Sequence, residues 1–194
     1  MGSSSRNLTD GAAAVGKTRV MPDLLVVTGP PGAGKSTVAS MLAERVVPSV
    51  VVRGDDFFAH LHEGAIDPWL PEADEQNRVV LAAAAAATGR FVDGGYPTIF
   101  DGVVGPWHLR SFVRAAGVRS LDYVVLLPPL DAVLDRVATR TGHGFTDAEA
   151  AAHMHGAFSR ADVEPRHVMA GEQHPADLVR AIEVARSAGS LRWS

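Results

Sequence analysis

The sequence predicts an α/β fold, a three-layer sandwich in which a five-stranded parallel sheet carries helices on both faces. Short runs rich in β-branched and apolar residues alternate along the 194 residues with longer segments of helical periodicity. These runs are apolar on both faces, as strands buried between two helical layers are. Strands that alternate with helices form parallel sheets joined by right-handed crossovers. We therefore expect one α/β domain over residues 21–194.

The strands and helices can be assigned in order along the chain. The predicted strands are residues 23–28, 50–53, 97–101, 121–127 and 167–169. The predicted helices are residues 35–47, 71–88, 105–116 and 131–140, with further helices that begin near 146 and 175. The first helix is expected to keep its apolar spacing as far as Val46 and to end at Pro48. The spacing of Thr146 and Glu149 predicts a capping box for a later helix. Residues 1–20 are small and polar, and we expect a flexible leader there.

Composition excludes several classes of protein. The sequence has no cysteine, which excludes disulfides, cysteine-based zinc sites and a thiol nucleophile. The net charge of −4 gives no basic field for nucleic acid, and the apolar runs are too short to cross a bilayer. We expect a cytoplasmic protein, a monomer or homodimer, with neither nucleic acid nor membrane as a partner.

A glycine-rich motif, GPPGAGKST at residues 29–37, lies between the first strand and the first helix. It matches the phosphate-binding pattern GxxxxGK[ST], in which backbone N–H groups and a helix N-terminus surround phosphates. A chance glycine-rich turn would lack this strand and helix. We expect Lys35 to reach the β- and γ-phosphates of ATP, with GTP left open, and Ser36 to bind Mg²⁺. The predicted nucleotide-binding residues are Gly29, Gly32, Ala33, Gly34, Lys35, Ser36 and Thr37.

Carboxylates follow the second and third strands, at the edge where ligands bind in open parallel sheets. Asp55 is the candidate base that accepts a proton from an acceptor hydroxyl, and Asp101 is the candidate carboxylate that assists Mg²⁺. Asp56 is expected to contact substrate or to cap the next helix. The structural alternatives are a helix N-cap for the Asp55 and Asp56 pair and a turn residue for Asp101.

Four segments, GPPGAGKST, RGDDFF, FDG and RVATR, together resemble the small P-loop kinases. These include gluconate kinase, shikimate kinase and, most closely in layout, the chloramphenicol phosphotransferase-like proteins. The resemblance implies a P-loop NTPase fold, use of ATP and Mg²⁺, and a base that maps to Asp55. It also implies lid arginines, for which Arg136 and Arg140 are the candidates, in a lid at about residues 136–160. The loop here is not serine-rich, which argues against chloramphenicol itself as the acceptor.

Spacing adds to the expectations for the lid and the acceptor pocket. Arg136 and Arg140 are four residues apart and share a helix face, which suits a clamp on phosphates. His153 and His155 occupy alternate helical positions that point apart, so we reject a metal site there. Aromatic and polar residues after the second strand are expected to form the acceptor pocket, with an ordinary core role as the alternative for the aromatics: Phe57, Phe58, Trp69, Gln76, Asn77 and Arg78.

Three functions agree with these features. The leading one is an ATP-dependent phosphotransferase that moves the γ-phosphoryl group to a hydroxyl of a small polar metabolite or antibiotic. Arg78 would meet an anionic group of the acceptor if it faces the pocket. The alternatives are a nucleoside or nucleotide kinase, and a nucleotide-dependent binding or resistance protein that phosphorylates no acceptor.

Overall fold

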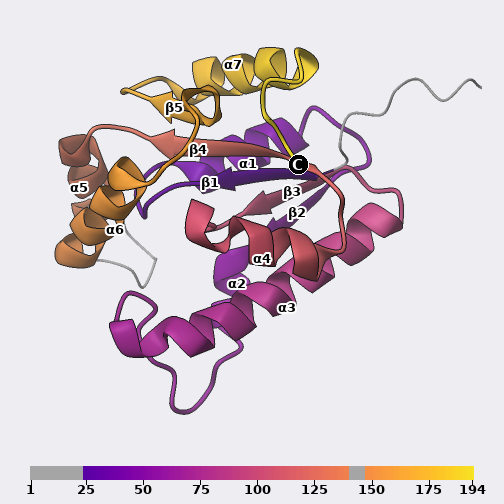
Figure 1. The fold of residues 1–194 in the computed structure, drawn as a ribbon. Helices are drawn as coiled ribbons and strands as arrows, with labels where there is room; N and C mark the ends of the chain where they lie inside the picture. The colour runs from indigo at the N-terminus through magenta and orange to yellow at the C-terminus, as the bar shows by residue number, and fades with distance from the viewer. Residues whose placement is uncertain (1–23, 140–146) are drawn as a thin grey trace, which may run out of the picture.

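A computed structural model of the chain describes residues 24–139 and 147–194. The predicted leader at residues 1–20, the lid arginine Arg140 and the capping residue Thr146 lie outside these residues. Figure 1 shows three layers, with a central sheet between two sets of helices. In this described part of the chain, no helix combines the length and the apolar character that a membrane span needs.

The sheet contains the five predicted parallel strands, in the order β2-β3-β1-β4-β5. Their bounds are β1 Leu24–Thr28, β2 Val50–Arg53, β3 Thr98–Asp101, β4 Leu121–Leu127 and β5 Val168–Ala170. The α/β prediction is therefore confirmed. The sequence missed one strand, β6 (Arg192–Trp193), which pairs antiparallel with the start of β4. Two residues carry no periodicity from which a strand could be predicted.

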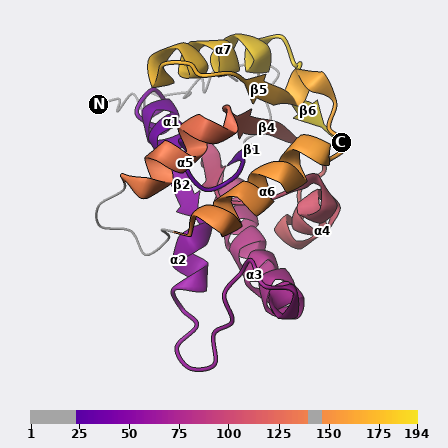
Figure 2. The same cartoon turned by 90° about the vertical axis from the view of Figure 1, so that its left-hand side faces the viewer.

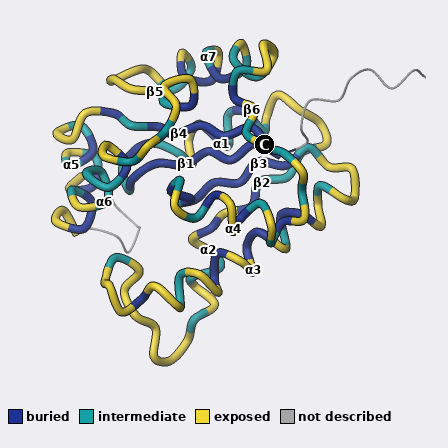
Figure 3. The backbone as a smooth tube through the Cα atoms, viewed as in Figure 1, coloured by how far each residue is buried: buried dark blue, intermediate teal, exposed yellow. Residues whose placement is uncertain are grey.

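Each face of the sheet is covered by its own set of helices (Figures 1 and 2). Side chains of β1 alternate between the faces: Leu25 and Val27 pack with α1 and α7, whereas Leu24 and Val26 pack with the other set. The buried strands form the centre of the molecule in Figure 3. The covering helices are α1 Lys35–Ala43 and α7 Pro175–Ser187 on one face, and α3 Asp74–Asp93, α4 Pro106–Ala116 and α6 Ala148–Arg160 on the other.

Shorter elements join these layers. They are α2 Gly54–Phe58, α5 Leu130–Ala138, and the 3₁₀ turns η1 Pro71–Ala73 and η2 Pro165–His167. Residues Val133 and Val137 of α5 pack against Ala151 of α6 in a small cluster of their own. This helix pair overlaps the segment predicted as a lid.

Two predictions about helix ends were wrong. Helix α1 ends at Ala43 and does not reach Val46, which is 39% exposed. The backbone tightens there, because the amide of Val46 bonds to the carbonyl oxygen of Ala43, three residues earlier. Helix α6 is capped by Asp147, whose carboxylate accepts a hydrogen bond of 2.9 Å from the amide of Ala150. An aspartate at the N-cap satisfies a first-turn amide without the predicted Thr146.

Gly89 lets α3 approach α4 closely. A Cβ at this position would lie 1.9 Å from the carbonyl oxygen of Ala116, a backbone atom that cannot turn aside. We expect Gly89→Ala to lower the free energy of unfolding by about 3 kcal/mol, because overpacking outweighs the better helix propensity of alanine. Urea denaturation measures this loss.

Gly156→Ala in α6 is the matched control. Its Cβ would meet only the flexible end of the Arg160 side chain. This variant should unfold at or above the wild-type urea midpoint. Equal midpoints for the two variants would show that the close approach of α3 to α4 does not exist.

Candidate active site

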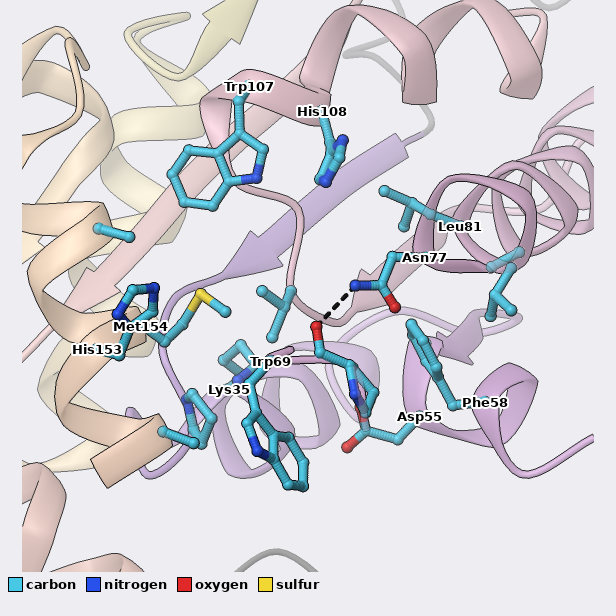
Figure 4. Close-up of a pocket in the computed structure, with 18 of the residues that line it drawn as sticks. Lys35, Asp55, Phe58, Trp69, Asn77, Leu81, Trp107, His108, His153 and Met154 are labelled. Atoms are coloured by element: carbon cyan, nitrogen blue, oxygen red, sulfur yellow. Dashed lines mark hydrogen bonds between the residues drawn. The ribbon is translucent and has the colours of Figure 1, made fainter. Parts of the chain in front are cut away.

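A cavity of about 950 Å³ opens at the carboxyl ends of β1, β2 and β3. Its lining comes from the glycine-rich loop, α2, the segment 68–71, α3, the start of α4, and α6. Figure 4 shows Lys35, Asp55, Trp69 and Asn77 around this space. Ligand cavities in proteins have similar volumes, so the space is large enough for a nucleotide phosphate tail and an acceptor together.

The glycine-rich loop adopts a conformation that its glycines make accessible. Gly29, Gly32 and Gly34 have φ angles of 143°, 80° and 91°, which side chains rarely allow. A Cβ on Gly29 would also lie 2.2 Å from the carbonyl oxygen of Leu126. The loop ends at Gly34, which caps α1 with no side-chain hydrogen bond, so the first-turn amides remain available to an anion.

The predicted nucleotide-binding residues divide into two groups. Gly32, Gly34, Lys35 and Ser36 line the cavity. Gly29 and Ala33 are buried, so they would support a nucleotide only through the backbone of the loop. Thr37 is exposed and is not among the described residues that line the cavity, so it would contact a nucleotide only from the edge of the loop. The Lys35 ammonium group donates to the carbonyl oxygen of Pro30 at 3.0 Å.

Ser36 and Asp101 lie in contact beside the loop, where the hydroxyl of Ser36 donates to the carboxylate. Burial raises the pKa of Asp101 above its ordinary value, and the Ser36 hydrogen bond and the Lys35 charge offset part of the rise. Oxygen ligands and a poorly solvated carboxylate fit Mg²⁺, which proteins bind through one or two carboxylates plus phosphate oxygens. These residues could hold Mg²⁺ as predicted.

Asp101→Asn should stabilise the nucleotide-free protein at pH 7. At a pH above the raised pKa of Asp101, the carboxylate is ionised in the folded and in the unfolded protein. The folded protein then bears the full free-energy cost of burying the charge. Below the unfolded value of 3.8 both states are neutral and the benefit disappears. We expect a melting temperature about 2–4 °C higher at pH 7, which corresponds to roughly 1 kcal/mol in a domain of this size.

Calorimetry at pH 7 and pH 3 measures this difference. The same variant should bind ATP with Mg²⁺ about tenfold more weakly, because a group that supports the metal is lost. A melting temperature below wild type at pH 7 would contradict the assignment. Asp56→Asn, which changes an exposed carboxylate, is the control and should leave both measurements unchanged.

Asp55 lies in the first turn of α2 and lines the cavity with Lys35. Its charge is close enough to Asp101 to contribute to the raised pKa of that carboxyl. The alternative that Asp55 and Asp56 act as a helix N-cap was wrong. Helix α2 begins at Gly54, and Arg53 holds the N-cap position. Asp56 is exposed and is not among the described lining residues, so its expected contact with the acceptor gains no support.

Part of the set of residues predicted for the acceptor pocket lines the cavity. Phe58, Trp69 and Asn77 line it. The side chain of Phe57 instead packs against the core beneath α3. Gln76 is used locally, since its amide bonds to both the N–H and the C=O of Ile66 at 2.8 and 2.6 Å.

Arg78 does not face the described cavity. Its guanidinium pairs with Glu75 one helical turn earlier, and 62% of the side chain is exposed. The expectation that Arg78 meets an anionic acceptor therefore loses its structural basis. The i,i+3 pair of opposite charges was visible in the sequence and would have indicated this surface position.

Of the two arginines predicted for the lid, only Arg136 lies within the residues that the structure describes. Arg136 on α5 approaches the phosphate loop, with its guanidinium 3.5 Å from the carbonyl oxygen of Gly32 and 3.6 Å from the Glu172 carboxylate. The sequence missed Arg160, which ends α6 and lines the cavity. His153 also lines it, whereas His155 donates to the carbonyl oxygen of Pro128 at 2.9 Å, so the two rings point apart.

Two buried hydroxyls hold the segment between Asp101 and α4. Thr28 Oγ accepts a hydrogen bond of 2.8 Å from the amide of Val104. Tyr123 Oη donates to the carbonyl oxygen of Val104, also at 2.8 Å. Burial raises the pKa of Tyr123, so its hydroxyl keeps the proton that it donates. Val104 is thereby fixed from both β1 and β4, and Trp107 follows it into the cavity wall.

The parallel sheet and the glycine-rich loop at the start of α1 define a P-loop protein. A family model described as an AAA domain matches residues 24–162. The match covers well over half of the chain, and the chain belongs to this family.

Solved structures of kinases have a similar fold. A sugar kinase from Janibacter sp. HTCC2649 has a TM-score of 0.64 at 22% identity, over 87% of this chain and 94% of its own. A gluconokinase from Sinorhizobium meliloti 1021 has a TM-score of 0.65 at 22% identity, over 89% and 95%. The tunicamycin resistance protein of Deinococcus radiodurans has a TM-score of 0.63 at 18% identity, over 86% and 95%. These identities show a shared fold.

Among curated proteins, an adenylate kinase from Gemmatimonas aurantiaca is 36% identical over 124 residues, which are 57% of this chain. The chain spans about half the length of that relative, with 51% of it covered.

Proposed function

We propose that the chain is an ATP-dependent kinase that transfers the γ-phosphoryl group to a hydroxyl of a small molecule. The observation that carries the proposal is the shared cavity. Lys35 and Ser36 of the phosphate loop, the carboxylate of Asp55 and an acceptor wall from α3, α4 and α6 all line one space. A protein that only bound nucleotide would not need space for a second molecule between the phosphate loop, the Asp55 carboxylate and the wall formed by α3, α4 and α6.

Each residue has a role in this reaction. The loop amides and the Lys35 ammonium group bind the β- and γ-phosphates and stabilise the charge that develops on them. Ser36 and Asp101 would hold Mg²⁺, which neutralises charge between the phosphates. Asp55 orients the acceptor hydroxyl and takes its proton as the oxygen forms a bond to the γ-phosphorus, while the bond from that phosphorus to the bridging oxygen breaks and ADP leaves.

The helix pair α5 and α6 is proposed to act as the lid. Arg136 already lies near Gly32 of the loop, and Arg160 lies on the cavity wall. Guanidinium groups that move over the γ-phosphate would exclude water and limit hydrolysis of ATP. Arg140, four residues after Arg136, is the remaining candidate for the same role.

A nucleotide kinase is the second candidate, because the relative that matches over 124 residues is an adenylate kinase. That protein's name makes AMP a necessary test compound. The pairing of Arg78 with Glu75 removes the cation that we expected to meet a monophosphate.

The test is transfer of label from ATP labelled in its γ-phosphate. The full chain is incubated with Mg²⁺ and a library that contains sugars, sugar acids, shikimate, AMP, nucleosides and amphipathic alcohols. Label in an organic phosphate supports the kinase, and label that appears only in ADP when AMP is supplied supports the nucleotide kinase. Label that appears only in inorganic phosphate with every compound contradicts both and favours a nucleotide-dependent binding or resistance protein.

A further inference from the structure

The acceptor side of the cavity is mainly apolar. Aromatic and aliphatic side chains reach it from the helices α2, α3, α4 and α6 and from two connecting segments, and most of them are labelled in Figure 4. Its principal members are Phe58, Trp69, Leu81, Val103, Trp107 and Met154. Trp107 is supported from behind by Phe158, with ring centroids 5.3 Å apart. A wall of this kind favours a ligand with apolar surface, because burial of that surface drives binding.

Asn77 is a polar member of this lining. Its side-chain nitrogen donates to the carbonyl oxygen of Pro68 at 2.7 Å, which fixes the orientation of the amide (Figure 4). Its oxygen, Oδ1, is buried and has no hydrogen-bond partner among the described residues. A buried carbonyl oxygen without a donor is unfavourable, and a ligand that supplies an O–H or N–H would satisfy it.

Most cations near this side are turned away from the apolar wall or are neutral, and the acidic side chain of Asp74 also lines the cavity. Arg78 pairs with Glu75 outside the cavity. Arg160 lies along its own helix, with a guanidinium nitrogen 2.9 Å from where a Cβ on Gly156 would be. Burial lowers the pKa of His108, which leaves its ring neutral at pH 7. A sugar acid or a monophosphate would have to bring its charge against the apolar wall, which is costly.

We propose that the acceptor is an uncharged alcohol with a mainly apolar, ring-containing body, and that a second hydroxyl or an amide of this molecule donates a hydrogen bond to Asn77 Oδ1. The inference rests on the proposed function, since the reacting hydroxyl must face Asp55. It replaces the polar metabolite expected from the sequence with an amphipathic molecule. Asn77 then selects acceptor molecules that are mainly apolar and carry one hydrogen-bond donor at a fixed position.

Calorimetric titration of the full chain with ADP and Mg²⁺ present tests this acceptor class. The probes are a naphthyl-substituted ethanediol, its monomethyl ether, gluconate and AMP. The diol should bind at least about tenfold more tightly than gluconate or AMP, and about 5–10-fold more tightly than the ether, which lacks one donor. The acceptor class is overturned if gluconate or AMP binds more tightly than the diol, or if the diol does not bind.

Variants of two adjacent residues of α3 test the role of Asn77. Asn77→Leu should weaken the diol about 5–10-fold and the ether by less than about twofold. Asn77→Asp keeps an acceptor oxygen and should preserve the preference for the diol, and melting curves check that both variants fold. Arg78→Gln, one position along the helix and outside the described lining, should change neither affinity.

If Asn77→Leu weakens the binding of the diol and of the ether by the same factor, the proposed hydrogen bond to Asn77 is overturned. Phosphoryl transfer is measured separately through Asp55 and the labelled-ATP screen. A wrong acceptor class therefore leaves label in some other organic phosphate, whereas a wrong proposed function leaves none.

Discussion

Asp55→Asn is expected to lower the rate of phosphoryl transfer about 10²–10⁴-fold and to leave ATP affinity within about twofold of wild type. The amide keeps the size of the side chain at the cavity wall but cannot take the proton of the acceptor hydroxyl. The transfer rate is measured with the best acceptor from the labelled-ATP screen, and ATP affinity by calorimetry.

The chain provides a matched control one residue away. Asp56→Asn removes a carboxylate from the same turn of α2, but this side chain is exposed and outside the described cavity lining. Its transfer rate should stay within about twofold of wild type. A wild-type rate in Asp55→Asn, or equal losses in both variants, would show that the base lies elsewhere.

Lys35→Met is expected to lower transfer about 10²–10³-fold and to weaken ATP binding as well. The lysine begins α1, lines the cavity and contributes to the electrostatics of Asp101. Methionine keeps most of the length of the side chain and removes the positive charge that stabilises the transferring phosphoryl group. Steady-state kinetics and calorimetry with ATP measure the two losses.

Arg45→Met is the control for loss of a cation. Arg45 is exposed and pairs with Glu183 away from the cavity. This variant should keep its transfer rate and ATP affinity within about twofold of wild type. ATP affinity and transfer at wild-type levels in Lys35→Met would refute the placement of the phosphates at the loop.

The sheet and the phosphate loop could be predicted because their sequence signals are local. Five apolar runs alternated with helical segments, and the loop required glycines at fixed spacing before Lys35 and Ser36. The structure has these strands, and Gly29 lies where a side chain would meet the backbone of β4. The end of α1 could not be predicted, since Val46 keeps the helical period although the chain leaves the helix earlier.

The acceptor wall was predictable only in part, because it is assembled from distant segments. One position along a helix turns a side chain by about 100°, so sequence alone could not decide between Asn77 and Arg78. The structure places the first in the cavity and pairs the second with Glu75. Trp107 and Met154 resemble ordinary core residues in the sequence, and only the packing of α4 and α6 brings them to the same space.

The two hydrogen bonds that hold Val104 give the cavity one stiff side and one adaptable side. The Trp107 side follows a backbone tied to Thr28 and Tyr123 at Val104, so its main chain is held in place when a bulkier ligand binds. Met154 lies on α6, and an unbranched thioether side chain changes shape at little cost. Added groups on an acceptor should therefore be tolerated when they point toward α6 and rejected when they point toward α4. Selectivity for the proposed acceptor would then be directional, depending on where an acceptor is enlarged more than on its total size.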